Sequence, residues 1–404
     1  MSTDTQRLKV LSAGIFSLIL MLGIGRFAYT PLLPVMQQQQ VLGIAEGGWL
    51  AAINYGGYLC GAILAAMIGD LVVKDRLYRG SLVLALLTTV GMGLTENIWL
   101  WAVLRFFAGL ASAGGLLIGS GLILNWLIRH GHRSELGIHI SGMGLGISLC
   151  ALAVELMSPW FDWRGQWLLF SLIGGLILIP AWRWLPSPDR SQLNHNGPQM
   201  QDNPPGRLFL RLFMAAYFCA GVGYAVSATF IVAIVEQLPG QAGNGALAFI
   251  VVGVAAAPAC ILWDLIARRI GNINALSSAY LLQILSLLLP VMIPGLSTSL
   301  IGAALFGATF IGIVSLVLTM AGRYYPSRPA RMMGVMTISY GIAQIIAPAL
   351  TGLLAEHYGS YDAAIWLAII MMAAGSLLTL PLGILERRKR QPRGTSTAAL
   401  RATT

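Results

Sequence analysis

The sequence has 404 residues, of which 57% are hydrophobic and 10% are charged, with a mean hydropathy of +0.76 and a formal net charge of +10. A soluble fold of this length could not cover its surface with so few charges, so these values exclude a water-soluble domain and indicate a chain immersed in lipid. The positive charges lie between apolar runs rather than on one soluble face, which argues against nucleic-acid binding.

The apolar runs, taken in chain order, predict twelve transmembrane helices, because a helix needs about 20 apolar residues to cross the hydrocarbon core. The third run is short, and its assignment depends partly on the alternation of charge described below. The predicted spans are 10–36, 46–69, 80–95, 98–126, 136–157, 166–185, 209–235, 245–267, 272–293, 298–322, 333–356 and 363–385.

Basic residues mark every second connection between these runs. Positively charged loops stay in the cytoplasm during insertion, so both termini are predicted to be cytoplasmic. Of the 25 Lys and Arg residues, all but Arg26, Arg105 and Arg164 fall in seven segments. These are 1–9, 70–79, 129–133, 183–211, 268–269, 323–331 and the C-terminal tail.

A polar stretch rich in Pro and Gly, 186–208, indicates a cytoplasmic linker between two six-helix bundles, 1–185 and 209–385, with a basic cytoplasmic tail at 386–404. The two bundles look like copies of each other. Gly23 corresponds to Gly221 at an offset of 198, and three further glycine pairs differ by 197: Gly56 and Gly253, Gly115 and Gly312, and Gly137 and Gly334. Repeats of this kind are typical of transporters that bind substrate between two halves.

Several motifs make the chain resemble the major facilitator superfamily over essentially its whole length. Arg105-x-x-x-Gly109 is similar to that superfamily's motif on the fourth helix, and Asp162-Trp163-Arg164 resembles the turn before the sixth. The segments Gly25–Tyr29, Leu305–Gly312 and Tyr340–Gln344 are closest to the bacterial YbfB/YjiJ-type members. The segment Gly69–Arg76 departs from the superfamily pattern, so the usual cytoplasmic latch is expected to be altered.

This resemblance implies an all-α membrane protein with twelve transmembrane helices in two pseudo-symmetric six-helix bundles, placed in the bacterial inner membrane. It further implies secondary active transport of a small organic solute by alternating access, coupled to protons. We expect a monomer in contact with membrane lipid. The alternatives are a multidrug or metabolite efflux antiporter, or a non-transporting sensor of the same fold. The fifth run lacks the proline of the antiporter motif, which disfavours drug antiport.

Arg26 is the strongest candidate for substrate binding. It lies about 16 residues into the first run, roughly 24 Å from its start, too far for the side chain to reach the cytoplasmic surface. A charge at this depth costs several kcal/mol unless it meets water, a counter-ion or a substrate. Its fork-shaped guanidinium suits a carboxylate, whereas the alternative role is a hydrogen-bonded contact between helices.

Other polar residues inside the runs complete the candidate site. Superfamily members implicate the counterpart of Arg105 in proton coupling, and Glu155, predicted at a similar height, is the candidate proton carrier; an interfacial glutamate is the alternative. Contacts between helices are the alternative for the neutral residues. The predicted substrate-binding set is Arg26, Tyr29, Asn54, Tyr58, Arg105, Tyr224, Tyr340 and Gln344.

Enzyme chemistry is not expected, because no cluster of acids, histidines or cysteines gathers at one predicted membrane face. The four cysteines lie in separate apolar runs without His or Cys at ligand spacing, so no metal site is predicted. Gly23–Ala28 matches a dinucleotide fingerprint formally but lies inside a predicted span with no preceding strand, so no cofactor is expected.

Overall fold

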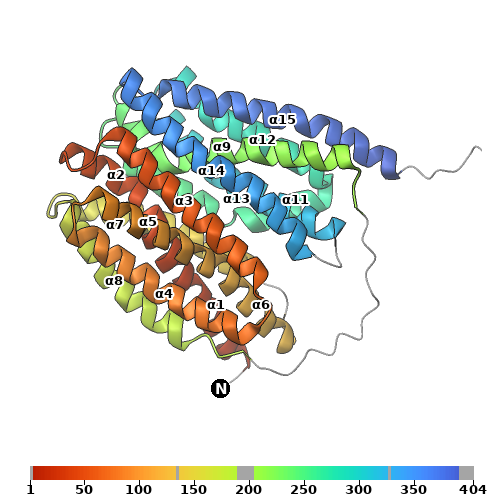
Figure 1. The fold of residues 1–404 in the computed structure, drawn as a ribbon. Coiled ribbons are helices and arrows are strands. Elements are labelled where there is room, and N and C mark those ends of the chain that lie inside the picture. Colours follow the sequence, from red (N-terminus) through yellow and green to blue (C-terminus); the bar gives the residue numbers. More distant parts are fainter. Residues whose placement is uncertain (1–2, 133–135, 189–203, 326–328, 391–404) are drawn as a thin grey trace, which may run out of the picture.

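Long apolar helices joined by short turns make up the computed structural model, which describes residues 3–132, 136–188, 204–325 and 329–390 (Figure 1). Within these ranges, eleven helices are long and apolar enough to cross a membrane, and one bent pair makes a twelfth. The prediction of twelve spans is therefore confirmed. Leu172, Leu176 and Ile370 are among many large apolar side chains exposed on the outer surface, as a lipid-facing surface requires.

The first and fourth spans are continuous helical rods that each contain a π-helical segment. The first span is α1 (Thr3–Leu18), η1 (Ile19–Phe27) and α2 (Tyr29–Gln38), and the fourth is α5 (Ile98–Ala113), η2 (Gly114–Gly119) and α6 (Ser120–Arg129). The other helices of the first half are α3 (Ile44–Met67), α4 (Leu71–Leu94), α7 (Leu136–Met157) and α8 (Trp163–Arg183). The second half contains α9 (Arg207–Gln237), α10 (Gly245–Ala256), α11 (Ala259–Ile270), α12 (Asn272–Met292), α13 (Leu296–Tyr324), α14 (Pro329–Tyr358) and α15 (Asp362–Arg390).

The predicted span 80–95 is wrong at its start, because α4 begins at Leu71. The Asp70 side chain accepts hydrogen bonds from the Val72 and Val73 amides and caps the helix there. Farther along, Arg79 pairs with Asp75 and donates to the carbonyls of Trp182 and Leu185 at the end of α8. The basic segment is thus helical and braces α4 against α8 within the first half.

The predicted span 245–267 is bent by 49° between α10 and α11. Pro258 stands at the break, where it supplies no amide to continue the helical ladder. Gly253 lies against α7 so closely that a methyl group there would come within 2.6 Å of the Gly144 carbonyl oxygen. The bend therefore accompanies a close contact between the two halves.

The two halves lie side by side and meet mainly along two helix pairs, with a smaller contact between α2 and α9 (Figure 1). α3 packs along α14, with Gly48 close to Gly352, and α7 packs along α10. The predicted linker 186–208 falls largely outside the described residues, as does the tail beyond Arg390. The glycine contacts allow the backbones of facing helices to approach closely, as is common inside membranes.

Candidate functional site

The backbone that carries Arg26 is not α-helical. Arg26 lies in η1, whose last turn closes with a hydrogen bond from the Ala28 amide to the Gly23 carbonyl at 2.7 Å. A methyl group on Gly23 would come within 2.9 Å of the Gly146 Cα atom of α7, so the wide turn fits only because a glycine is present. π-Helical turns occur frequently at functional sites.

Two side chains of α5 bind the carbonyl groups of η1. The Arg105 guanidinium donates from Nη1 to the Gly25 carbonyl at 3.1 Å, and the Ser112 hydroxyl lies 2.7 Å from the Met21 carbonyl. These bonds compensate the irregular hydrogen bonding of a π-helix, because buried carbonyl groups need partners. The fourth span therefore fixes the backbone on which Arg26 is mounted.

The Arg26 guanidinium is enclosed by aromatic rings at the junction of the two halves. Its central carbon lies 4.4 Å from the ring centre of Tyr55 and 4.9 Å from that of Tyr58, both on α3. Nη2 donates to the Tyr224 hydroxyl of α9 at 3.2 Å, across the junction. Arg26 is only 7% exposed, and its Nε is buried with no hydrogen-bond partner among the described residues.

Arg105, the second buried arginine at the junction, also lies against an aromatic ring. Its guanidinium lies 4.3 Å from the ring centre of Tyr29, whose hydroxyl donates to the Gly47 carbonyl at 3.0 Å. The Asn54 amide donates to the backbone carbonyl of Arg105 at 2.8 Å. The predicted residues Tyr29, Asn54 and Arg105 are therefore brought together, but they bind helix backbones. This arrangement fits a positioning role.

The second half contributes a set of aromatic rings around Tyr224. The Tyr340 ring lies 5.8 Å from that of Tyr224 and 4.5 Å from that of Tyr217. Gln344 follows Tyr340 by one turn of α14; it is buried, and its Oε1 has no partner within the described ranges. The structure thus brings Arg26, Tyr58, Tyr224 and Tyr340 to one place at the junction.

Carboxylates are placed elsewhere in the described part of the chain. The buried carboxylate of Asp75 pairs with Arg79 at 3.0 Å. Glu155 is exposed in the last turn of α7, so the structure does not bring it to Arg105 or Arg26. The two buried arginines at the junction therefore carry positive charge without a carboxylate partner among the described residues.

Sequence reasoning missed Tyr55, whose ring lies nearest to Arg26. It precedes Tyr58 by three residues, a spacing that places both on one helix face and could have revealed it. Tyr55 also reaches the second half, because its hydroxyl lies 3.3 Å from that of Thr229. Tyr217 stands seven residues before Tyr224, again on one helix face, and was missed in the same way.

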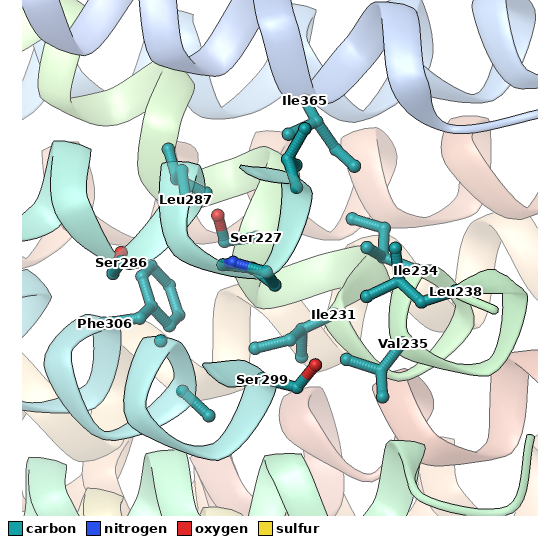
Figure 2. Close-up of a pocket in the computed structure, with 14 residues that line it drawn as sticks. Ser227, Ile231, Ile234, Val235, Leu238, Ser286, Leu287, Ser299, Phe306 and Ile365 are labelled. Carbon is teal, nitrogen blue, oxygen red and sulfur yellow. The ribbon is translucent and has the colours of Figure 1, made fainter. Parts of the chain in front are cut away.

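A small apolar pocket lies within the second half (Figure 2). It has a volume of about 50 Å³ and is bounded by α9, α12, α13 and α15. Phe306 lines this pocket and also stacks against Tyr224, with ring centres 6.4 Å apart. Phe306 therefore contacts both Tyr224 and the pocket.

Comparison with known proteins identifies the family. A family model described as "Uncharacterised MFS-type transporter YbfB" matches residues 18–380. The chain belongs to this family. The membership predicted from the motifs is confirmed, and the protein is a multi-pass membrane transporter of the major facilitator superfamily.

Three relatives are transporters of small organic solutes. The gentisate transporter of Corynebacterium glutamicum is 23% identical over 86% of this chain and 80% of its own length. The probable sulfoacetate transporter SauU of Cupriavidus necator is 24% identical over 72% of this chain and 74% of its own. The niacin transporter NiaP of Acinetobacter baylyi is 29% identical, but the match covers only 33% of this chain and 30% of NiaP.

Solved structures with the same fold are more distant in sequence. The crystal structure of a point mutant of the nucleoside transporter NupG superposes with a TM-score of 0.74 over 94% of this chain and 99% of NupG, at 12% identity. A bacterial homologue of the human lysosomal transporter Spinster gives a TM-score of 0.71 at 13% identity, over 98% of this chain and all of that one. At these identities the likeness shows the fold alone.

Proposed function

We propose that this protein is a secondary transporter that binds the carboxylate of a small organic acid through Arg26. The observation that carries the proposal is the buried Arg26 guanidinium, which has one hydrogen bond, to a neutral hydroxyl, and an unpartnered Nε among the described residues. A buried charge in a membrane is costly without a partner of opposite charge. A carboxylate can accept from two guanidinium N–H groups at once, and so supplies that partner.

The relatives support an acidic substrate. They are named for gentisate, sulfoacetate and niacin, each of which carries a carboxylate. A cationic drug fits the site less well, because the buried charges at the junction, Arg26 and Arg105, are both positive. We therefore favour uptake or exchange of an organic anion over efflux of cationic drugs.

Binding at Arg26 would act directly on the junction of the two halves. Arg26 belongs to the first half and Tyr224 to the second, so their hydrogen bond joins the halves. A carboxylate that takes the Nη2 hydrogen now donated to Tyr224 displaces that hydroxyl and breaks this bond. Substrate would thereby replace a direct contact between the halves with a contact through itself, as alternating access requires.

The binding proposal is tested by ligand-induced shifts in the melting temperature of the purified protein. Small carboxylic acids are each compared with the corresponding neutral amide, and the acids alone are expected to stabilise the protein. Arg26→Gln should abolish the shift, and Arg26→Lys, which keeps the charge but loses the fork, should weaken binding about tenfold or more.

Arg164→Gln is the matched control, because Arg164 is exposed and pairs with Glu96 away from the junction. It should respond to acids as the wild type does. Equal stabilisation by acids and amides, or an unchanged response in a folded Arg26→Gln protein, would contradict the proposal.

We also propose that the protein lies in the bacterial inner membrane with both termini in the cytoplasm. The distribution of Lys and Arg supports this orientation. An alkaline-phosphatase fusion after Asp202 should be inactive, and one after Gln40, in the turn between α2 and α3, should be active. The reverse pattern would overturn the orientation.

A further inference from the structure

The part of the site contributed by the second half is a buried cluster of stacked aromatic rings, which we call the ring wall. It is composed of Tyr217, Tyr224, Phe306, Phe310 and Tyr340. Neighbouring rings lie 4.5 to 6.4 Å apart between centres and are inclined by 23° to 34°. At these separations near-parallel rings lie face to face, so the five rings form one stacked cluster, unlike the edge contact between Tyr55 and Tyr224 at 80°.

Arg26 stands at the edge of this ring wall. Its Nη2 donates to the hydroxyl of Tyr224, which belongs to the wall. A carboxylate that replaces this hydroxyl must place the remainder of its molecule beside Tyr224 and its neighbours. The charged end of a ligand thus faces the first half, and its uncharged body faces the rings of the second.

The ring wall also has room to move. Phe306 stacks against Tyr224 and also lines the apolar pocket of about 50 Å³ (Figure 2). Protein interiors are otherwise close-packed, so a side chain beside free space can move more easily than its neighbours. A ligand ring entering next to Tyr224 can displace Phe306 toward this pocket.

We infer that the substrate is a planar aromatic monocarboxylate whose ring stacks on the ring wall while its carboxylate binds Arg26. This inference rests on the proposed function and adds the chemical class of the substrate. When the two halves separate, the side of the wall that faces Arg26 and Tyr55 would be exposed to water. A flat ring can extend the stack on this side and a puckered ring cannot, because aromatic pairs gain energy beyond the area that they bury.

The test uses three probes on the purified full chain, with dissociation constants measured by titration calorimetry. Benzoate has both the ring and the charge, cyclohexanecarboxylate has a similar size and the same charge without a flat ring, and benzamide has the ring without the charge. Stacking on two rings predicts that benzoate binds about tenfold more tightly than cyclohexanecarboxylate. Benzamide should not bind measurably.

A pair of variants locates the preference. Tyr340→Leu removes a ring of the wall and should reduce the benzoate preference severalfold while cyclohexanecarboxylate still binds. Tyr340→Phe retains the ring and should retain the preference. Equal affinities of the two acids in the wild type would overturn the aromatic inference and leave the proposed function standing.

The other outcomes are also decisive. Binding of benzamide as tight as that of benzoate, or binding of neither acid, would overturn the proposed function and this inference with it. A benzoate preference that survives in both Tyr340→Leu and Tyr224→Leu would show that the ring binds away from the wall, and would overturn the inference alone.

Discussion

Arg26 donates a hydrogen bond to Tyr224, a residue 198 positions farther along the chain. The same offset separates Gly23 from Gly221 in the internal repeat, and it recurs in the bond from the Thr30 hydroxyl to the Ala228 carbonyl. Equivalent positions of two repeats can meet only near the axis that relates them. The charge at this axis is present in one repeat and absent from the other, so a ligand with one charged end is held in one orientation.

Removal of the Tyr224 hydroxyl should tighten the binding of a carboxylate. In Tyr224→Phe the ring remains, but Nη2 of Arg26 has lost the acceptor with which the ligand competes. A net hydrogen bond contributes about 0.5–1.5 kcal/mol, so the affinity for benzoate should rise about two- to tenfold. Titration calorimetry measures the change. Tyr280→Phe, which removes a hydroxyl bonded to the Ala216 carbonyl elsewhere, is the control and should bind as the wild type does. Weaker binding by Tyr224→Phe would count against competition.

Substitution of Arg105 should weaken binding of the ligand without changing the preference for a charged ligand over a neutral one. Arg105→Lys replaces the planar guanidinium, so the new side chain cannot stack on Tyr29 while it donates to the Gly25 carbonyl. The backbone of η1 should then be held less firmly. We expect about tenfold weaker binding of benzoate, with benzamide still rejected because Arg26 is intact. Binding of both probes is measured by calorimetry, and melting confirms that the variant is folded. Loss of the discrimination between acid and amide would mean that Arg105 itself contacts the carboxylate.

The contact between α3 and α5 depends on glycine. A methyl group on Gly109 would overlap the Asn54 carbonyl, so Gly109→Ala should lower the melting temperature and the yield of monodisperse protein. Gly121→Ala is the matched control, because Gly121 lies in α6 with open space where its Cβ would be. It should be neutral or stabilising by up to about 1 kcal/mol, as for an exposed helical glycine. Equal effects of the two substitutions would show that packing at Gly109 is not tight.

Proton coupling stays a prediction of the resemblance, and the exposed position of Glu155 separates it from the carboxylate site. We expect Glu155→Gln vesicles to accumulate labelled benzoate under a pH gradient at the wild-type rate. An uncoupler should abolish accumulation in both proteins. Loss of accumulation with preserved exchange of labelled for unlabelled benzoate would restore Glu155 as the proton carrier. Accumulation that resists the uncoupler would remove proton coupling altogether.

The spans were predictable from hydropathy because transfer into lipid depends on composition and length, which a sequence displays directly. The start of α4 was missed because its first turns contain the charged residues Lys74, Asp75, Arg76 and Arg79, and the Asp70 cap determines where the helix begins. The π-helical turn at Arg26 could not be predicted, since it depends on Arg105 and Ser112, which approach it only in the folded chain. Arg26 itself was identified because a buried charge is conspicuous in an apolar run.

The π-helical segment η1 makes the register of the backbone part of the binding site. A π-helical turn contains one residue more than an α-helical turn. If η1 changed to α-helical hydrogen bonding, its residues would therefore rotate by about 100° around the helix axis relative to the rest of the span. Arg26 would then leave the space between Tyr55 and Tyr224 without any change of its own rotamer. The direction in which this charge points therefore depends on the π-helical register of η1, which the bond from the Ala28 amide to the Gly23 carbonyl closes.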